Sequence, residues 1–211
     1  MKKTVFLVLL ACLAWQAHAM EPEQVKPVKN LIVLIPDGTS LATISTARWY
    51  QWYMNPDMPK LAIDPYICGT VRTHSSNAPI GDSAPTTSCY MTGHPSRTGY
   101  VATYPPHDPG NDIYPMDPKR AYQPMTTLLE AMKLVQHKAT GLVFTCEFTH
   151  ATPADCSAHS YSRKRYEWIA PQMVHNDIDV VIGGGTSLLD EAGEAYLKAN
   201  GYNVYRNDMA G

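Results

Sequence analysis

Asn30-Leu-Ile-Val-Leu-Ile-Pro-Asp-Gly38 is the stretch of this sequence that decides the fold class. Its continuous run of branched apolar residues ends at a Pro-Asp-Gly turn. A short run of this kind predicts a strand buried on both faces, as in a parallel sheet. Asp37 would then follow the carboxyl end of that strand, where open α/β sheets bind their ligands.

Further periodic segments follow this first strand. Apolar positions on one face predict a helix over 124–135, with Pro124 in its first turn, and another helix over 186–200, closed by Gly201. The alternation of strands and helices predicts an α/β fold with a doubly wound, mostly parallel central sheet and helices on both faces. The further strands are expected at 68–73, 141–146 and 178–182.

Two irregular segments complete this outline. Residues 100–122 are rich in Pro, Asp and Tyr, which predicts a long surface loop. Residues 202–205 resemble the start of another strand, and the sequence stops at Gly211. We therefore expect residues 20–211 to be the N-terminal part of a single α/β domain, incomplete at the C-terminus, with a short unpaired tail as the alternative.

The N-terminus has the pattern of an export signal. Lys2 and Lys3 precede a nearly unbroken apolar stretch, and Ala17-His18-Ala19 fits a cleavage site, so residues 1–19 are predicted to be a signal peptide. The stretch is too short for a membrane span. The protein is therefore expected to be periplasmic or secreted. Lipidation at Cys12 is the alternative.

Composition narrows the classes of partner. The chain has 211 residues, 45% of them hydrophobic, and a formal net charge of −2 without a basic tract, so nucleic acid is not expected as a partner. The four cysteines beyond residue 19 would permit disulfides in an exported protein, with three pairings open, or serve as small core residues. They are Cys68, Cys89, Cys146 and Cys156.

Asp82 and Ser83 begin a segment, Asp-Ser-Ala-Pro-Thr-Thr, that reads as a loop entering a helix. Helix N-termini favour anions through free amides and the dipole. Ser83 is then a candidate nucleophile, although a plain N-cap is the commoner role for such a serine. Because the sequence has no Gly-x-Ser-x-Gly motif, activation of this hydroxyl by a metal is the chemically sensible route.

Thr149-His-Ala-Thr-Pro-Ala154 follows the third predicted strand and should open a helix. Thr152 could serve as its N-cap, and His150 could be an ordinary loop histidine. Arg163 lies eleven residues beyond Thr152, a spacing that would place both on one helical face. Arginine suits bidentate recognition of phosphate, and Asp82 could pair with it and hold its fork.

Taken together, these segments resemble the alkaline phosphatase family over about residues 30–185. The resemblance implies a phosphate monoester hydrolase that uses two zinc ions and one magnesium ion, acts through a phosphoserine intermediate and forms a homodimer. Ser83 would be the nucleophile and a metal ligand, and Arg163 would clamp the phosphoryl oxygens. Asp37, Thr152 and His150 would be metal ligands.

The family's remaining zinc ligands, several His and Asp, and its magnesium Glu have no matching segment here. The chain is therefore expected to hold a nucleophile and part of a metal site, and full activity is not expected from these residues alone. The alternatives are a sulfatase or phosphodiesterase of related type, and a non-catalytic exported module that binds phosphate or metal. A sulfatase is disfavoured because the Cys-x-Pro-x-Arg segment is absent.

Overall fold

The computed structural model of the protein describes residues 28–58 and 60–206. The chain divides into two units, residues 1–36 and 37–211. The predicted signal peptide, with Cys12, lies outside the described residues and stays a prediction. Within the described residues, no helix is long and apolar enough to cross a membrane.

The first predicted strand is wrong in this structure. Residues 30–35 have neither strand nor helix assignment, and the side chains of Ile32 and Leu34 are 83% and 86% exposed. A strand is defined by hydrogen bonds to a neighbouring strand, and residues 30–35 have no such assignment. For the same reason the strands expected at 68–73 and 202–205 are not formed.

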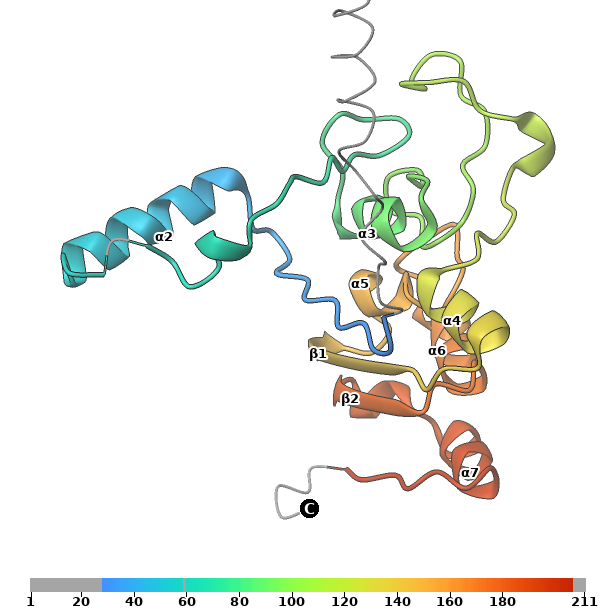
Figure 1. The fold of residues 1–211 in the computed structure, drawn as a ribbon. Helices are drawn as coiled ribbons and strands as arrows, with labels where there is room; N and C mark the ends of the chain where they lie inside the picture. The colour runs from blue at the N-terminus through green and yellow to red at the C-terminus, as the bar shows by residue number, and fades with distance from the viewer. Residues whose placement is uncertain (1–27, 59, 207–211) are drawn as a thin grey trace, which may run out of the picture. The chain divides into compact units, whose positions relative to one another are not determined.

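The other two predicted strands are confirmed, one of them with a shifted range. β1 (Gly141–Glu147) pairs with β2 (Val180–Gly184) in a two-stranded parallel sheet (Figure 1). Gly183 lies against the Phe144 ring, where an added Cβ would stand 2.0 Å from a ring carbon, so a larger residue would require the Phe144 ring to move. This parallel pair with flanking helices agrees with the α/β class. The larger, doubly wound sheet stays a prediction.

The two predicted helices begin where a side chain caps them. Thr127 caps α4 together with Glu130, so this helix starts four residues later than the apolar spacing indicated. The segment 186–200 divides into a short 3₁₀ turn and α7, because Asp190 caps a new helix. The α-helices are α2 (Leu41–Met54), α3 (Ser83–Thr92), α4 (Leu128–Gln136), α5 (Ala151–Ala154), α6 (Tyr166–His175) and α7 (Glu191–Ala199). The 3₁₀ helices are Asp64–Tyr66, Pro118–Arg120 and Thr186–Leu188.

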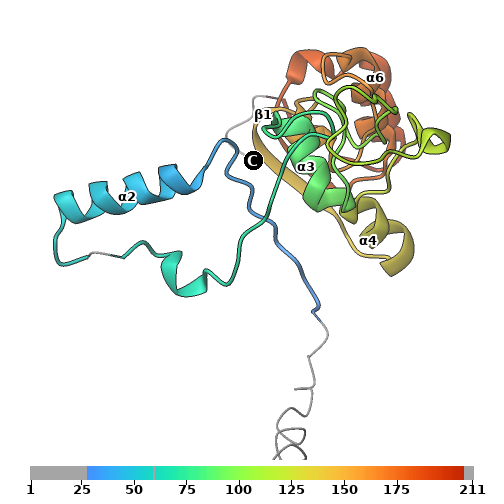
Figure 2. The same ribbon diagram turned by 90° about the horizontal axis from the view of Figure 1, so that it is seen from above.

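A core rich in small residues is formed by α3, α5 and α6. α3 contacts α5 (Figure 1), and α3 also contacts α4 (Figure 2). Small side chains at a helix contact let the two backbones approach closely. This close approach brings the start of α3 near the start of α5. The buried residues are Ala84, Val101, Ala151, Ala154, Ala158, Ile169, Met173 and Ile178.

The predicted surface loop at 100–122 is wrong for its first part. Val101, Ala102 and Tyr104 are buried. Isolated bridges from Val101 to Ser160 and from Thr103 to Pro124 bind this segment to the core, which supplies the backbone partners that a buried loop needs. Residues 106–115 and 117–122 are mostly exposed.

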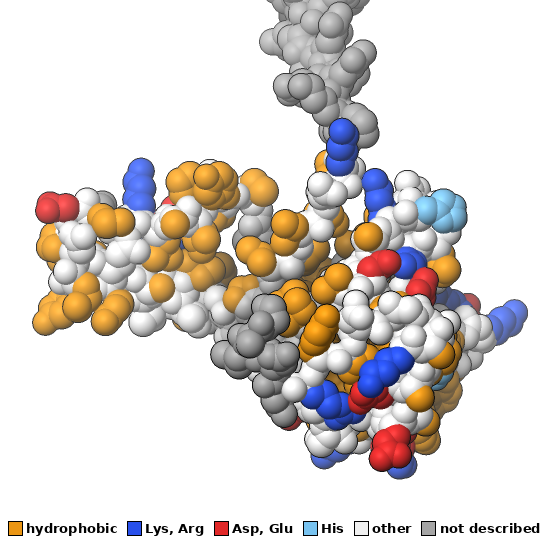
Figure 3. Space-filling model, turned by 90° about the horizontal axis from the view of Figure 1, so that it is seen from below, with side chains coloured by type: hydrophobic (Ala, Val, Ile, Leu, Met, Phe, Trp, Pro, Cys, Tyr) orange, Lys and Arg blue, Asp and Glu red, His pale blue; other side chains and the backbone are white. Residues whose placement is uncertain are grey.

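Many large apolar side chains are exposed, and Figure 3 shows hydrophobic side chains gathered over much of one face. On α2 none of the described residues is buried. All four cysteines in the described residues are free, so no disulfide pairing is formed among them.

Candidate active site

Ser83 is the first residue of α3, as the sequence predicted for a loop that enters a helix. Its Oγ donates a hydrogen bond to Oδ2 of Asp37 at 2.8 Å. The N-cap is Asp82 rather than Ser83, and its side chain makes no capping bond. The serine hydroxyl is therefore directed at a carboxylate, and the amides at the start of the helix remain open to an anion.

Arg163 lies beside this helix start and pairs with Asp82, with 3.3 Å between Nη1 and Oδ2. The ion pair expected from the sequence is thus present. Nη2 also lies 3.1 Å from Nε2 of His150. The backbone fixes the arrangement, since Gly99 accepts from the Arg163 amide at 2.7 Å and donates to Oδ1 of Asp82 at 3.3 Å.

The sequence argument that placed Arg163 on a helical face shared with Thr152 is wrong. The helix α5 ends at Ala154, and Arg163 lies in a turn before α6. Tertiary contacts position it instead, because Ser160 pairs with Val101 just before this turn. The partnership of Arg163 with His150 was not predicted, and no sequence pattern indicated it.

Thr152 is not the N-cap of α5, since His150 occupies that position. The Thr152 side chain lies in the first turn of the helix, and its Oγ1 is buried without a hydrogen-bond partner. Thr149 Oγ1 has the same property. A buried hydroxyl without a hydrogen-bond partner lowers the stability of the folded state. A ligand or a water molecule bound to the two threonine oxygens would remove this cost.

The residues present fit part of a metal site. Thr152 offers an unpartnered oxygen, and the oxygens of Asp37 and Ser83 are close enough to share a cation. Oxygen donors of this kind suit magnesium. The described residues contain no group of three or more His, Cys, Asp or Glu able to hold a metal ion, so they supply no complete zinc site by themselves. The contact with Arg163 occupies Nε2 of His150, so the structure gives no support to His150 as a ligand through that atom.

Thiolate ligands are equally unsuitable beside α5. Burial, with a smaller contribution from Asp155, raises the pKa of the Cys156 thiol to about 12. Metals bind the thiolate, so the raised pKa disfavours Cys156 as a ligand.

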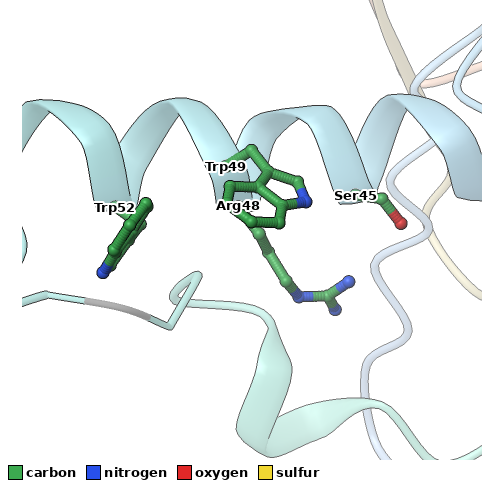
Figure 4. A pocket seen from close by; sticks show the side chains of 4 residues that line it. All are labelled: Ser45, Arg48, Trp49 and Trp52. Atoms are coloured by element: carbon green, nitrogen blue, oxygen red, sulfur yellow. The ribbon is translucent and has the colours of Figure 1, made fainter.

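An open pocket of about 330 Å³ lies along α2 and contains none of the predicted site residues (Figure 4). It is lined by Ser45, Arg48, Trp49 and Trp52. The guanidinium of Arg48 is paired with Asp64, so the wall is mainly indole. Its lining contains no serine paired with a carboxylate or histidine, so we do not place the active site there.

A serine hydroxyl held by a carboxylate at a helix start, beside an arginine, suits the binding of an anion such as phosphate. Residues 28–207 match the protein-family profile described as alkaline phosphatase. The chain belongs to the alkaline phosphatase family.

Curated relatives agree with this assignment. The chain is 33% identical over 180 residues to alkaline phosphatase 3 of Bacillus subtilis, covering 81% of this chain and 36% of that protein. It is 32% identical over 174 residues to the repressible alkaline phosphatase of Saccharomyces cerevisiae, covering 79% and 28%. The chain therefore spans about a third of the length of these relatives.

Solved structures show the same fold. A cold-active alkaline phosphatase from a psychrophilic Shewanella is 33% identical, with a TM-score of 0.63 over 79% of this chain and 39% of that one. A variant of TAB5 alkaline phosphatase with Mg bound has a TM-score of 0.62 at 23% identity, over 82% of this chain and 45% of that one. The second likeness supports the fold alone.

Proposed function

We propose that this chain carries the nucleophile and the phosphate-binding arginine of a phosphate monoester hydrolase. The observation that carries the proposal is the juxtaposition of two pairs. Ser83, at the start of α3, donates a hydrogen bond to Asp37. Asp82, the residue before it, forms an ion pair with Arg163. Membership of the alkaline phosphatase family supports the substrate class.

In the proposed reaction the Ser83 Oγ attacks phosphorus in line with the leaving alcohol oxygen. A P–O bond to serine forms as the P–O bond to the alcohol breaks, and the alcohol leaves with a proton. Water then attacks the phosphoserine, which restores the hydroxyl and releases inorganic phosphate. Arg163 and the amides at the start of α3 stabilise the charge on the phosphoryl oxygens in both steps.

Asp37 orients the serine through the hydrogen bond that it accepts, and Asp82 holds the Arg163 fork in place. Thr152 and Asp37 would hold a magnesium ion. Bound metal would supply Lewis-acid stabilisation of charged oxygens. The two zinc ions, the ligand role of His150, export and the homodimer remain predictions for the whole protein.

The test is capture of the phosphorylated enzyme. The chain is incubated with a phosphate monoester in the presence of zinc and magnesium, quenched in acid and mapped by mass spectrometry. We expect phosphate on Ser83 and none in Ser83→Ala. The matched control Ser45→Ala, on the exposed face of α2, should keep the label.

Turnover of a chromogenic monoester should fall by at least about 10³-fold in Ser83→Ala. Phosphate carried by a different residue, or turnover that survives Ser83→Ala, would contradict the proposal. Binding of inorganic phosphate with neither label nor turnover would favour a phosphate-binding module. Turnover of sulfate esters or phosphodiesters in preference to monoesters would favour the related hydrolase classes.

A further inference from the structure

Asp155 is a fully buried carboxyl group directly after α5, and no sequence pattern singled it out. Its Oδ1 accepts a hydrogen bond from the Ala102 amide at 2.7 Å and lies 2.5 Å from Oγ of Ser88. Its Oδ2 is buried and has no partner. If this carboxylate were ionised, one of its two charged oxygens, Oδ2, would be buried without a hydrogen-bond donor.

The contact with Ser88 is the first link of a buried chain of oxygens. Ser88 Oγ lies 3.0 Å from Oγ of Ser96, and Ser96 Oγ lies 2.8 Å from the carbonyl oxygen of Thr103. Both serine side chains are fully buried. Three oxygen–oxygen contacts therefore run in series from Asp155 to the Thr103 carbonyl.

Each of these contacts needs one proton to be a hydrogen bond. The Thr103 carbonyl can only accept, so the proton of Ser96 is committed to it. The proton of Ser88 then serves the contact with Ser96. The remaining contact, between Ser88 and Asp155, has no proton unless the carboxyl group supplies one.

We propose that Asp155 is a neutral carboxylic acid near neutral pH, whose proton, donated to Ser88, makes it a positioning residue for α3. The chain of bonds ties the middle of α3 to the segment 101–103. The carbonyl of the neutral acid, Oδ2, is a weaker acceptor than a carboxylate oxygen, so its lack of a partner costs less.

The surroundings agree with a neutral group. Burial raises the pKa of Asp155 well above its ordinary value, and the contacts with Ser88 and the Ala102 amide oppose this only in part. Asp82 raises the pKa of Asp155 further, and Arg163 lowers it. The other titratable groups that face Asp155 are Cys89 and Tyr90 of α3 and the adjoining Cys156.

This chain of hydrogen bonds connects two segments that contribute to the proposed site. Ser83 begins α3, and the segment 99–103 begins with Gly99, which bonds to both Asp82 and Arg163. Within this segment Ala102 has a positive φ of 35°, a strained conformation for alanine that the bond to Asp155 helps to hold. The value of this positioning for Ser83 rests on the proposed function, whereas the protonation state does not.

The first test is the pH dependence of unfolding in the wild type and in Asp155→Asn. A neutral Asp155 has a folded pKa above the unfolded value of about 3.9, so the native state binds more protons and loses stability as pH rises from there toward the folded pKa. The advantage of the wild type over Asp155→Asn should shrink between about pH 4 and 7, by up to about tenfold in the unfolding equilibrium constant per pH unit.

An ionised Asp155 predicts the opposite sign, so an advantage that grows with pH or stays flat overturns the proposal. The exposed Asp57→Asn is the matched control and should show no such slope relative to the wild type. Neither measurement uses phosphatase activity, so failure here is distinct from failure of the proposed function.

The second test does not require Asp155→Asn to fold. The infrared spectrum of the chain near neutral pH should contain the carbonyl band of a protonated carboxyl group. The band should move in Ser88→Ala, which removes the acceptor of the proton, and stay in place in Ser45→Ala. Absence of the band, or a band insensitive to Ser88→Ala, overturns the proposal.

Discussion

At the scale of single residues, Arg163 shares its guanidinium between Asp82 and His150 while a quarter of its side chain remains exposed. Arginine presents a planar fork of donors, and lysine presents a compact charge on a flexible stem. Two protein partners therefore orient the fork while leaving it within reach of a phosphate.

Arg163→Lys should weaken the binding of inorganic phosphate by about 10- to 100-fold, which corresponds to the loss of one charge-assisted hydrogen bond. Competitive inhibition by phosphate, or direct calorimetry, measures the change. Arg165→Lys is the matched control, because Arg165 pairs with Glu167 and stacks on Trp168 instead. Equal phosphate affinity in Arg163→Lys and the wild type would remove Arg163 from the site.

Thr152→Val separates a metal ligand from a merely buried hydroxyl. Since Thr152 Oγ1 has no partner, its replacement by a methyl group should cost no stability in chelator and should reduce the rise in Tm on addition of magnesium. Thr149→Val, also without a partner for its hydroxyl, should keep the full response to magnesium. An unchanged magnesium response in Thr152→Val would argue against Thr152 as a ligand.

At the scale of elements, α4 is held at its first turn by one side chain with two bonds. Thr127 Oγ1 accepts from the Glu130 amide at 3.2 Å and donates to the carbonyl of Cys156 at 2.5 Å. The second bond joins the start of α4 to the chain just beyond α5. Because Thr127 is fully buried, water does not replace the two hydrogen bonds when its hydroxyl is removed.

Thr127→Ala should therefore lower the free energy of unfolding by about 1–3 kcal/mol, from the lost cap and the unpaired carbonyl. Thr127→Ser keeps the hydroxyl and should recover most of this loss. Urea unfolding monitored by circular dichroism gives both values. If alanine and serine are equally destabilising, the methyl group rather than the hydroxyl is the important part.

Glu130 also contacts His159, with 3.0 Å between Oε1 and Nε2, while Nδ1 of His159 faces the carbonyl of Ala102 at 2.8 Å. Both ring nitrogens meet acceptors, so the imidazolium satisfies both. Burial alone would lower the pKa of His159, but the bonds to Glu130 and Ala102 outweigh it and raise the pKa. Burial would raise the pKa of Glu130, and the bonds from His159 and Thr127 lower it.

The sign of the pH dependence follows from these two directions. The contribution of His159 is complete below its unfolded pKa of about 6.5 and is lost as pH rises through the higher folded value. That of Glu130 is complete above about 4.3 and is lost as pH falls. Glu130→Gln should therefore cost most stability near pH 5.5 and less near pH 9, as measured by urea unfolding. A constant cost would contradict the charged pair.

At the scale of the whole molecule, the sequence predicted two strands, one helix start and one ion pair. The strands near 141 and 180, the helix start at Ser83 and the pair of Asp82 with Arg163 are present in the structure. The strand expected at 30–35 is not formed, because a ladder needs a partner that local pattern does not supply. Asp155 and the contact of Arg163 with His150 arise from tertiary packing, so no pattern in the sequence indicates them.

The exposed apolar surface leads to a prediction for the chain in solution. Large side chains on several described segments are more than half exposed, and apolar patches of this kind favour association. We expect the 211-residue chain to associate as its concentration rises, and sulfate to strengthen the association. Sedimentation velocity at several concentrations measures this, and Ile32→Glu with Leu34→Glu should weaken it. A single monomeric species throughout would contradict the prediction, because it would mean that these side chains are covered in solution.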